Sequence, residues 1–140
     1  MFARWSLLLL FALLPTLGCD ATPPPPLEAE IAPTLAFLQK HLFTPACAGC
    51  HSRAGLAGGF SMETADDTYA ALVDIPADNA IASVNGWVRI VPGDPDRSFL
   101  VRKMEQPGLG EGAPMPVGPF GLAEPWMNGI RQWIAEGAQR

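Results

Sequence analysis

Cysteine and histidine are scarce in this sequence of 140 residues, which has three cysteines and two histidines. Three of these five side chains stand together in the segment Cys-Ala-Gly-Cys-His over residues 47–51, and the other two are Cys19 and His41. A closed zinc site needs about four nitrogen or sulfur ligands, and Cys19 ends a leader-like segment, so the pattern argues against zinc. The strand–helix–strand context of a thioredoxin-like motif is lacking, and a disulfide within the segment would leave its histidine without a role.

A hydrophobic run long enough to span a membrane is lacking as well. The N-terminal apolar run over residues 7–14 is short, follows a single basic residue, Arg4, and leads through small or apolar residues to Gly18. This arrangement is typical of a cleaved export signal. The sequence therefore predicts a signal peptide over residues 1–18 and an extracytoplasmic location, periplasmic or at the cell surface.

Basic residues are few, with nine Lys and Arg against 14 Asp and Glu. Residues 1–18 contain one basic residue and no acidic one, so the remaining chain carries a net charge of −6. A nucleic-acid-binding protein needs a basic face, so this balance excludes nucleic acid as a partner. It is compatible with a protein partner that has a basic docking patch.

Cys19 has no evident partner for a disulfide. The stretch Thr-Leu-Gly-Cys over residues 16–19 resembles a bacterial lipobox, although Thr16 stands where leucine is usual. Lipidation of Cys19 would hold the protein on a membrane without a spanning helix. The alternative is ordinary signal cleavage nearby, with Cys19 discarded or left as a free thiol.

Residues 19–32 are predicted to form a lipidated N-terminus and a tether. Four consecutive prolines over 23–26 favour a polyproline II spacer. Such a spacer would lift the following domain clear of the lipid headgroups, and the alternative is a disordered N-terminus.

The segment over residues 47–51 indicates covalent attachment of haem. Each thiol can add across one haem vinyl group, and Cys47 and Cys50 have the spacing that brings both to the same side of a short turn. His51 then falls below the porphyrin plane, where its imidazole can bind iron as the proximal ligand. The sequence has no second Cys-x-x-Cys-His and no internal repeat, so we expect one haem c per chain. Covalent attachment of this kind takes place outside the cytoplasm, in agreement with the export signal.

Residues 33–140 are expected to form one small helical domain. Apolar residues at helical spacing predict four helices, over residues 33–41, 64–73, 95–106 and 124–136. Thr44-Pro45 is expected to break the first helix, and Trp126 or Trp133 of the last helix to cross the first. The caps and solvated residues of the middle helices are also predicted: Thr64 and Asp94 as N-caps, and Arg102 and Lys103 on the solvated face.

One stretch differs from its surroundings. Residues 81–84 and 87–91 are rich in β-branched and aromatic side chains and are separated by Asn85-Gly86. This pattern predicts a short β-hairpin over 81–91, with an irregular loop as the alternative.

Residues 107–121 are rich in glycine and proline and predict a long loop without secondary structure. Met115 stands between two prolines that restrict the backbone. We expect this loop to bring the Met115 thioether to the open face of the iron as the distal ligand. His41 lies just before the attachment segment and is expected to be a partly exposed surface residue. The other methionines are weaker candidates because they fall on predicted helices or soon after the attachment segment: Met104, Met127 and Met62.

In these features the chain resembles a class I monohaem cytochrome c domain of the type found in exported bacterial lipoproteins. The resemblance covers about residues 33–138. It is carried, in order, by the attachment segment, Val-Pro-Gly-Asp-Pro-x-x-Ser over 91–98, Met115-Pro116, and Ile-x-x-Trp-Ile-x-x-Gly-Ala over 130–138. It implies an all-α, cytochrome c-like fold around one covalent haem, with crossed N- and C-terminal helices and iron bound by His51 and Met115. The hairpin over 81–91 would be an insertion.

Iron bound by both His51 and Met115 would have no free position for a substrate, and the thioether would stabilise the ferrous state. The predicted function is therefore one-electron transfer to and from redox partner proteins, by a carrier rather than an enzyme. Two alternatives stay open. One is a haem enzyme or gas sensor in which Met115 is displaced, and the other is a surface binding module in which haem only supports the fold.

Replacement of Cys19 tests the predicted lipid anchor. We expect Cys19→Ser to move the protein from the membrane fraction to the soluble fraction, because the acylated thiol would be lost. Mass spectrometry of the mature wild-type protein should show the corresponding acyl additions. Retention of the variant on membranes would mean that Cys19 is not the anchor.

Overall fold

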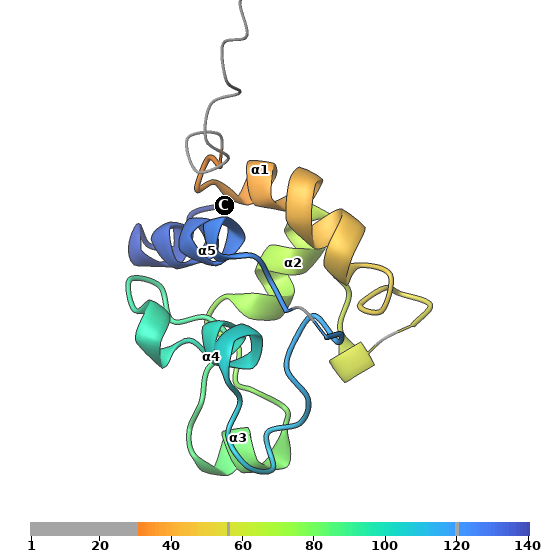
Figure 1. Cartoon of the computed structure of the whole chain (residues 1–140), viewed down its shortest axis with the longest axis vertical. Helices are drawn as coiled ribbons and strands as arrows, with labels where there is room; N and C mark the ends of the chain where they lie inside the picture. The colour runs from red at the N-terminus through yellow and green to blue at the C-terminus, as the bar shows by residue number, and fades with distance from the viewer. Residues whose placement is uncertain (1–30, 56, 120) are drawn as a thin grey trace, which may run out of the picture.

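The computed structural model describes residues 31–55, 57–119 and 121–140 (Figure 1). The predicted signal peptide, the predicted lipidation site at Cys19 and nearly all of the predicted tether lie outside these residues. No helix in the described part of the chain has the length and hydropathy of a membrane span. The chain is mostly helical, with α1 (Leu35–Leu38), the π-helix η2 (Gln39–Cys47), the 3₁₀ turn η3 (Ala57–Gly59), α2 (Ala65–Leu72), α3 (Ala80–Val84), the 3₁₀ turn η4 (Pro95–Arg97), α4 (Phe99–Glu105) and α5 (Glu124–Ala135).

The first helix reaches Cys47, the first residue of the predicted haem-attachment segment, without a break. Thr34 caps α1, because its Oγ1 accepts a hydrogen bond from the Phe37 backbone N–H at 3.3 Å. The predicted break at Thr44-Pro45 is wrong, since Pro45 lies inside η2. Proline removes one backbone donor, but hydrogen bonds here span five residues, as from Ala48 N–H to Phe43 O at 2.9 Å. The helix therefore ends at Cys47 and places this residue directly.

The later helices agree with the sequence more closely. Thr64 caps α2 and Asp94 caps η4, each accepting at 3.1 Å from the backbone N–H three residues on. The predicted third helix is divided at the buried Ser98, whose backbone is extended and whose hydroxyl donates to Asp94 O at 2.8 Å. α5 has its predicted start at Glu124, and Gly137 follows its end with a φ of +97°.

The predicted β-hairpin over 81–91 is wrong. Residues 80–84 form α3, because the Asn79 side chain accepts from two of its first backbone N–H groups, at 3.0 Å each. Asn85-Gly86 ends this helix instead of turning a hairpin. Residues 87–91 are bonded to residues 72–77 through isolated contacts, such as Asp74 N–H to Ile90 O at 3.0 Å. No strand occurs in residues 31–55, 57–119 and 121–140.

The core forms where α5 packs against α1, η2 and α2. Figure 1 shows α1 and α5 side by side near the C-terminus, and the two helices are in contact. Gly129 of α5 permits this approach, since a Cβ atom there would lie 2.5 Å from Ile31 Cγ2 and 3.8 Å from Leu38 Cδ2. Trp133, which is 1% exposed, packs edge-on against Phe43 with ring centroids 6.3 Å apart. The expected contact between the first and last helices is confirmed.

A buried polar contact joins the first helix to α2. Gln39 is 7% exposed and Thr68 is fully buried. The Gln39 amide donates to Met62 O at 2.8 Å and accepts from the Thr68 hydroxyl at 2.7 Å. A glutamine in this position has no sequence signal, because its partners lie 23 and 29 residues away.

Gln39→Ala should lower the free energy of unfolding by about 1–3 kcal/mol, because the Thr68 hydroxyl and Met62 carbonyl would be left buried without partners. Gln132→Ala is the matched control, since that side chain is exposed and bonds only Glu136 within the same helix region. Urea unfolding measures both. Equal effects of the two substitutions would contradict the structural role given to Gln39.

Candidate functional site

A single cavity of about 570 Å³ collects the residues that the sequence analysis singled out. Cys47, Cys50, His51 and Met115 all line it. Most of the remaining wall is apolar and comes from η2, the segment before α2, α4 and the loop after α4: Leu42, Phe43, Phe60, Met62, Leu72, Phe99, Leu100, Met104, Val117 and Leu122. The volume lies in the range of ligand and cofactor pockets, about 300–1,000 Å³.

The two thiols lie on a tight turn at the end of η2. The backbone N–H groups of Cys50 and His51 both donate to Cys47 O, at 3.2 and 2.9 Å. Both cysteines are free thiols; Cys47 is half-buried and Cys50 is exposed. Burial, and to a lesser degree the neighbouring Cys50, raises the pKa of the Cys47 thiol to about 11. The site therefore offers one thiol inside the cavity wall and one at its rim.

His51 is held in one orientation by a backbone group. Its Nδ1 lies 2.6 Å from Ala57 O, and because a carbonyl only accepts, Nδ1 carries the proton. Nε2 then keeps its lone pair for a metal ion, the arrangement found in metal-binding histidines. The Phe60 ring stacks on the imidazole with centroids 4.5 Å apart, and the Arg89 guanidinium lies 4.4 Å from the Phe60 centroid.

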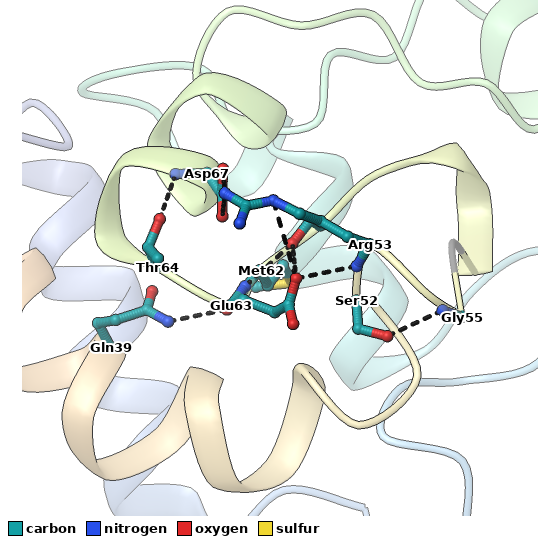
Figure 2. A network of polar contacts seen from close by, with 9 residues as sticks. Gln39, Ser52, Arg53, Gly55, Met62, Glu63, Thr64 and Asp67 are labelled. Atoms are coloured by element: carbon teal, nitrogen blue, oxygen red, sulfur yellow. Dashed lines mark hydrogen bonds and ion pairs between the residues drawn. The ribbon is translucent and has the colours of Figure 1, made fainter.

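The segment after His51 is tied to the start of α2 by the polar network in Figure 2. The Arg53 backbone N–H donates to Glu63 Oε2 at 2.9 Å, and its guanidinium donates to both carboxylate oxygens of Asp67. Hydrogen bonds from Thr64 and Arg53 hold the pKa of Asp67 below its usual range. In addition, Met62 N–H donates to His51 O at 2.7 Å. These contacts fix the chain on both sides of Ala57, whose own N–H donates to Cys50 O at 3.2 Å.

The loop that carries Met115 is bound to α4 by charged side chains. The Lys103 ammonium donates to the Glu111 and Ala113 carbonyl oxygens, and Lys103 O accepts from Met115 N–H at 2.8 Å. Glu111 is 3% exposed and accepts from Arg102 Nε at 2.6 Å. The hydrogen bonds from Arg102, and then from Gly108 N–H, lower the pKa of this carboxyl.

The expectation that Arg102 and Lys103 are solvated is met only in part: both residues are half-buried, and their charged groups turn toward the loop. The local reason is that Glu111 offers a buried negative charge within their reach. One feature of the sequence indicates this contact: Glu111 is the single acidic residue in the stretch 107–121, which is otherwise rich in glycine and proline.

Three methionines line the cavity, but they differ in what surrounds them. Met62 is 3% exposed within the core, and Met104 packs against the core from α4. Met115 comes from a loop without regular structure and is only half-buried. Met127 belongs to the core and does not line the cavity. His41 is exposed, its ring is tilted by 37° against Phe37 with centroids 4.5 Å apart, and it does not line the cavity, as expected for a surface histidine.

The residues present fit a covalently held haem. The cavity is large and mostly apolar, a thiol pair lies at its edge, an imidazole in the wall has its Nε2 lone pair available, and a thioether is contributed by a separate segment. Comparisons with protein-family models, with curated proteins and with solved structures gave no match for this chain.

Alkylation of the haem-free protein tests the difference between the two thiols. Since the thiolate is the nucleophile, Cys47 should react with iodoacetamide more slowly than the exposed Cys50, and its rate should keep rising as the pH approaches about 11. Timed alkylation followed by peptide mass spectrometry measures both rates. In urea the rates should converge; equal rates in the folded protein would contradict the burial of Cys47.

Proposed function

We propose that this chain is an extracytoplasmic c-type cytochrome that carries one haem and transfers single electrons. The observation that supports this most directly is that the two cysteines, the histidine and the loop methionine line one cavity, although Met115 is separated in the chain from the other three. The mostly helical structure is consistent with the small cytochrome c-like fold that the sequence resembles.

Each of the four residues has a role in this proposal. Cys47 and Cys50 would form the thioether links, His51 Nε2 would bind iron on one side, and the Met115 sulfur on the other. Haem bound in this way supplies one-electron chemistry, and a thioether ligand favours the ferrous state. If His51 and Met115 both bound the iron, no position would be left for a substrate, which favours a carrier over an enzyme.

The surroundings of the site suit electron transfer. The mostly apolar wall would limit the access of water, and the hydrogen bond from His51 Nδ1 to Ala57 O would keep the imidazole from turning when the iron changes oxidation state. Cys50 is exposed, so the edge of the haem linked to it would lie at the surface. That edge is where a redox partner protein would approach.

The proposed location follows from the sequence. An export signal and lipidation at Cys19 would place the domain on the outer side of a membrane, on a proline-rich tether. The negative charge of the chain after residue 18 favours a redox partner with a basic docking patch and disfavours nucleic acid.

A haem enzyme or gas sensor is the second candidate. It is favoured by the position of Met115 outside the packed core, on a loop without regular structure. Release of this loop would open one face of the iron to a small ligand. The two candidates differ in whether the ferric and ferrous proteins stay low-spin and resist carbon monoxide and cyanide.

Met115→Ala tests the proposed distal ligand. We expect the wild-type protein to be low-spin in both oxidation states. The variant should be high-spin or misligated, should have a lower reduction potential, and should bind cyanide quickly. Met104→Leu is the matched control, because Met104 also lines the cavity but packs against the core.

The proteins are produced in a host that attaches haem c, and optical spectra of their oxidised and reduced forms measure these effects. An unchanged spectrum for Met115→Ala would contradict the ligation. A high-spin Met104→Leu variant would instead assign the sulfur ligand to Met104. A colourless, metal-free wild-type product would remove the basis of the proposal.

A further inference from the structure

We infer that Glu111 is a positioning residue for Met115: with Arg102 and Lys103 it forms a clamp that holds the loop on α4 and keeps the thioether at the iron. This inference rests on the proposed function. It assigns to α4 a task that the flanking prolines cannot perform, because prolines restrict the backbone locally but do not attach it to the rest of the molecule.

Glu111 is the only carboxylate among the buried side chains of the described residues. Its Oε2 accepts from Arg102 Nε at 2.6 Å and from Gly108 N–H at 2.5 Å. Its backbone N–H donates to Gly108 O at 3.1 Å. The carboxylate therefore joins Glu111 to Gly108 within the first part of the loop, and it joins this part of the loop to Arg102 on α4. Charged hydrogen bonds of this kind are among the stronger ones in proteins.

Lys103 holds the second part of the loop. Its ammonium donates to Glu111 O at 3.0 Å and to Ala113 O, and its own carbonyl accepts from Met115 N–H. One helical residue is thus bonded to the loop at positions 111, 113 and 115. The last of these bonds fixes the backbone of the proposed ligand itself.

Two glycines of the loop are explained by this clamp. A Cβ atom on Gly108 would lie 2.5 Å from Arg102 Nη2, and one on Gly112 would lie 3.3 Å from Lys103 Nζ. Gly112 also has a φ of +83°, which other residues rarely adopt. Small residues here let Arg102 reach the Glu111 carboxylate and let Lys103 reach the loop backbone.

The clamp connects the loop to a fixed part of the molecule. The side chains of Phe99 and Val101 on α4 are buried, and α4 contacts α5. Met115, in contrast, is not among the side chains packed into the core. Opening of the loop would therefore require breaking the bonds to Arg102 and Lys103, and also the bond from Asn79 Nδ2 to Gly110 O at 3.2 Å. With haem bound, the bonds to Arg102 and Lys103 would limit how often the iron is open to a small ligand.

The test compares Glu111→Ala with Glu105→Ala in the haem-loaded protein. Glu105 is a carboxylate on the same helix, but its partner, Arg131, belongs to α5 and not to the loop. Two quantities are measured: amide hydrogen exchange of peptides covering residues 106–119, and the rate at which imidazole binds to the ferric protein. A merely structural role would change thermal stability without changing loop exchange or ligand entry.

We expect Glu111→Ala to increase both rates by at least about tenfold, the factor that corresponds to about 1.4 kcal/mol. Glu105→Ala should remain close to wild type. Glu111→Gln should lie between them, because an amide oxygen can still accept from Gly108 N–H and Arg102 Nε. This milder variant also provides the comparison should the alanine protein fail to mature.

Loop exchange and imidazole binding that are the same in the Glu111 and Glu105 variants would overturn the clamp. A wild-type ferric protein that already binds imidazole without delay would overturn the ligation by Met115, and with it the positioning role. The exchange measurement separates these two failures, because it reports the attachment of the loop whether or not sulfur binds iron.

Discussion

The close packing of the first helical segment on α5 is the constraint on which the cavity depends. Gly129 lets the two helices approach each other, and the Trp133 ring packs edge-on against Phe43. Because α1 continues through η2 to Cys47, this packing also sets the position of the first thiol. A shift of α5 would therefore move the segment over residues 47–51 with it.

Polar side chains then hold the irregular segments on this helical frame. Gln39 joins η2 to α2, Arg53 ties the segment after His51 to Asp67, and Glu111 ties the Met115 loop to α4. The contacts of Gln39 and Glu111 are partly or fully withdrawn from water, where an unmade hydrogen bond is costly, whereas the contact between Arg53 and Asp67 is exposed. In a small domain with long loops, such contacts contribute stability that a larger domain would obtain from a larger apolar core.

The proposed electron carrier uses the two kinds of contact differently. The imidazole of His51 is held by a backbone carbonyl inside a short, well-bonded segment, whereas the Met115 loop is held on α4 by the Lys103 carbonyl and by the side chains of Arg102 and Lys103. We therefore expect the histidine side of the iron to be the more rigid one. Exchange between the carrier and a ligand-binding state would take place on the methionine side.

Local chemistry by itself determined the N-caps at Thr64 and Asp94, the limits of α5 and the spacing of the residues over 47–51, because each depends on neighbours within a few positions. The tertiary structure alone decided that Pro45 stays helical, that residues 80–84 form α3, and that Arg102 and Lys103 turn inward. Local preference does not indicate the contacts that decide these positions: the hydrogen bonds around Pro45 span five residues, residues 87–91 bond to residues 72–77, and Glu111 lies eight or nine residues from the two cations. Tertiary packing likewise brings the four proposed haem-binding residues to one cavity. Met115 reaches this cavity through a loop whose course depends on the buried Glu111 carboxylate.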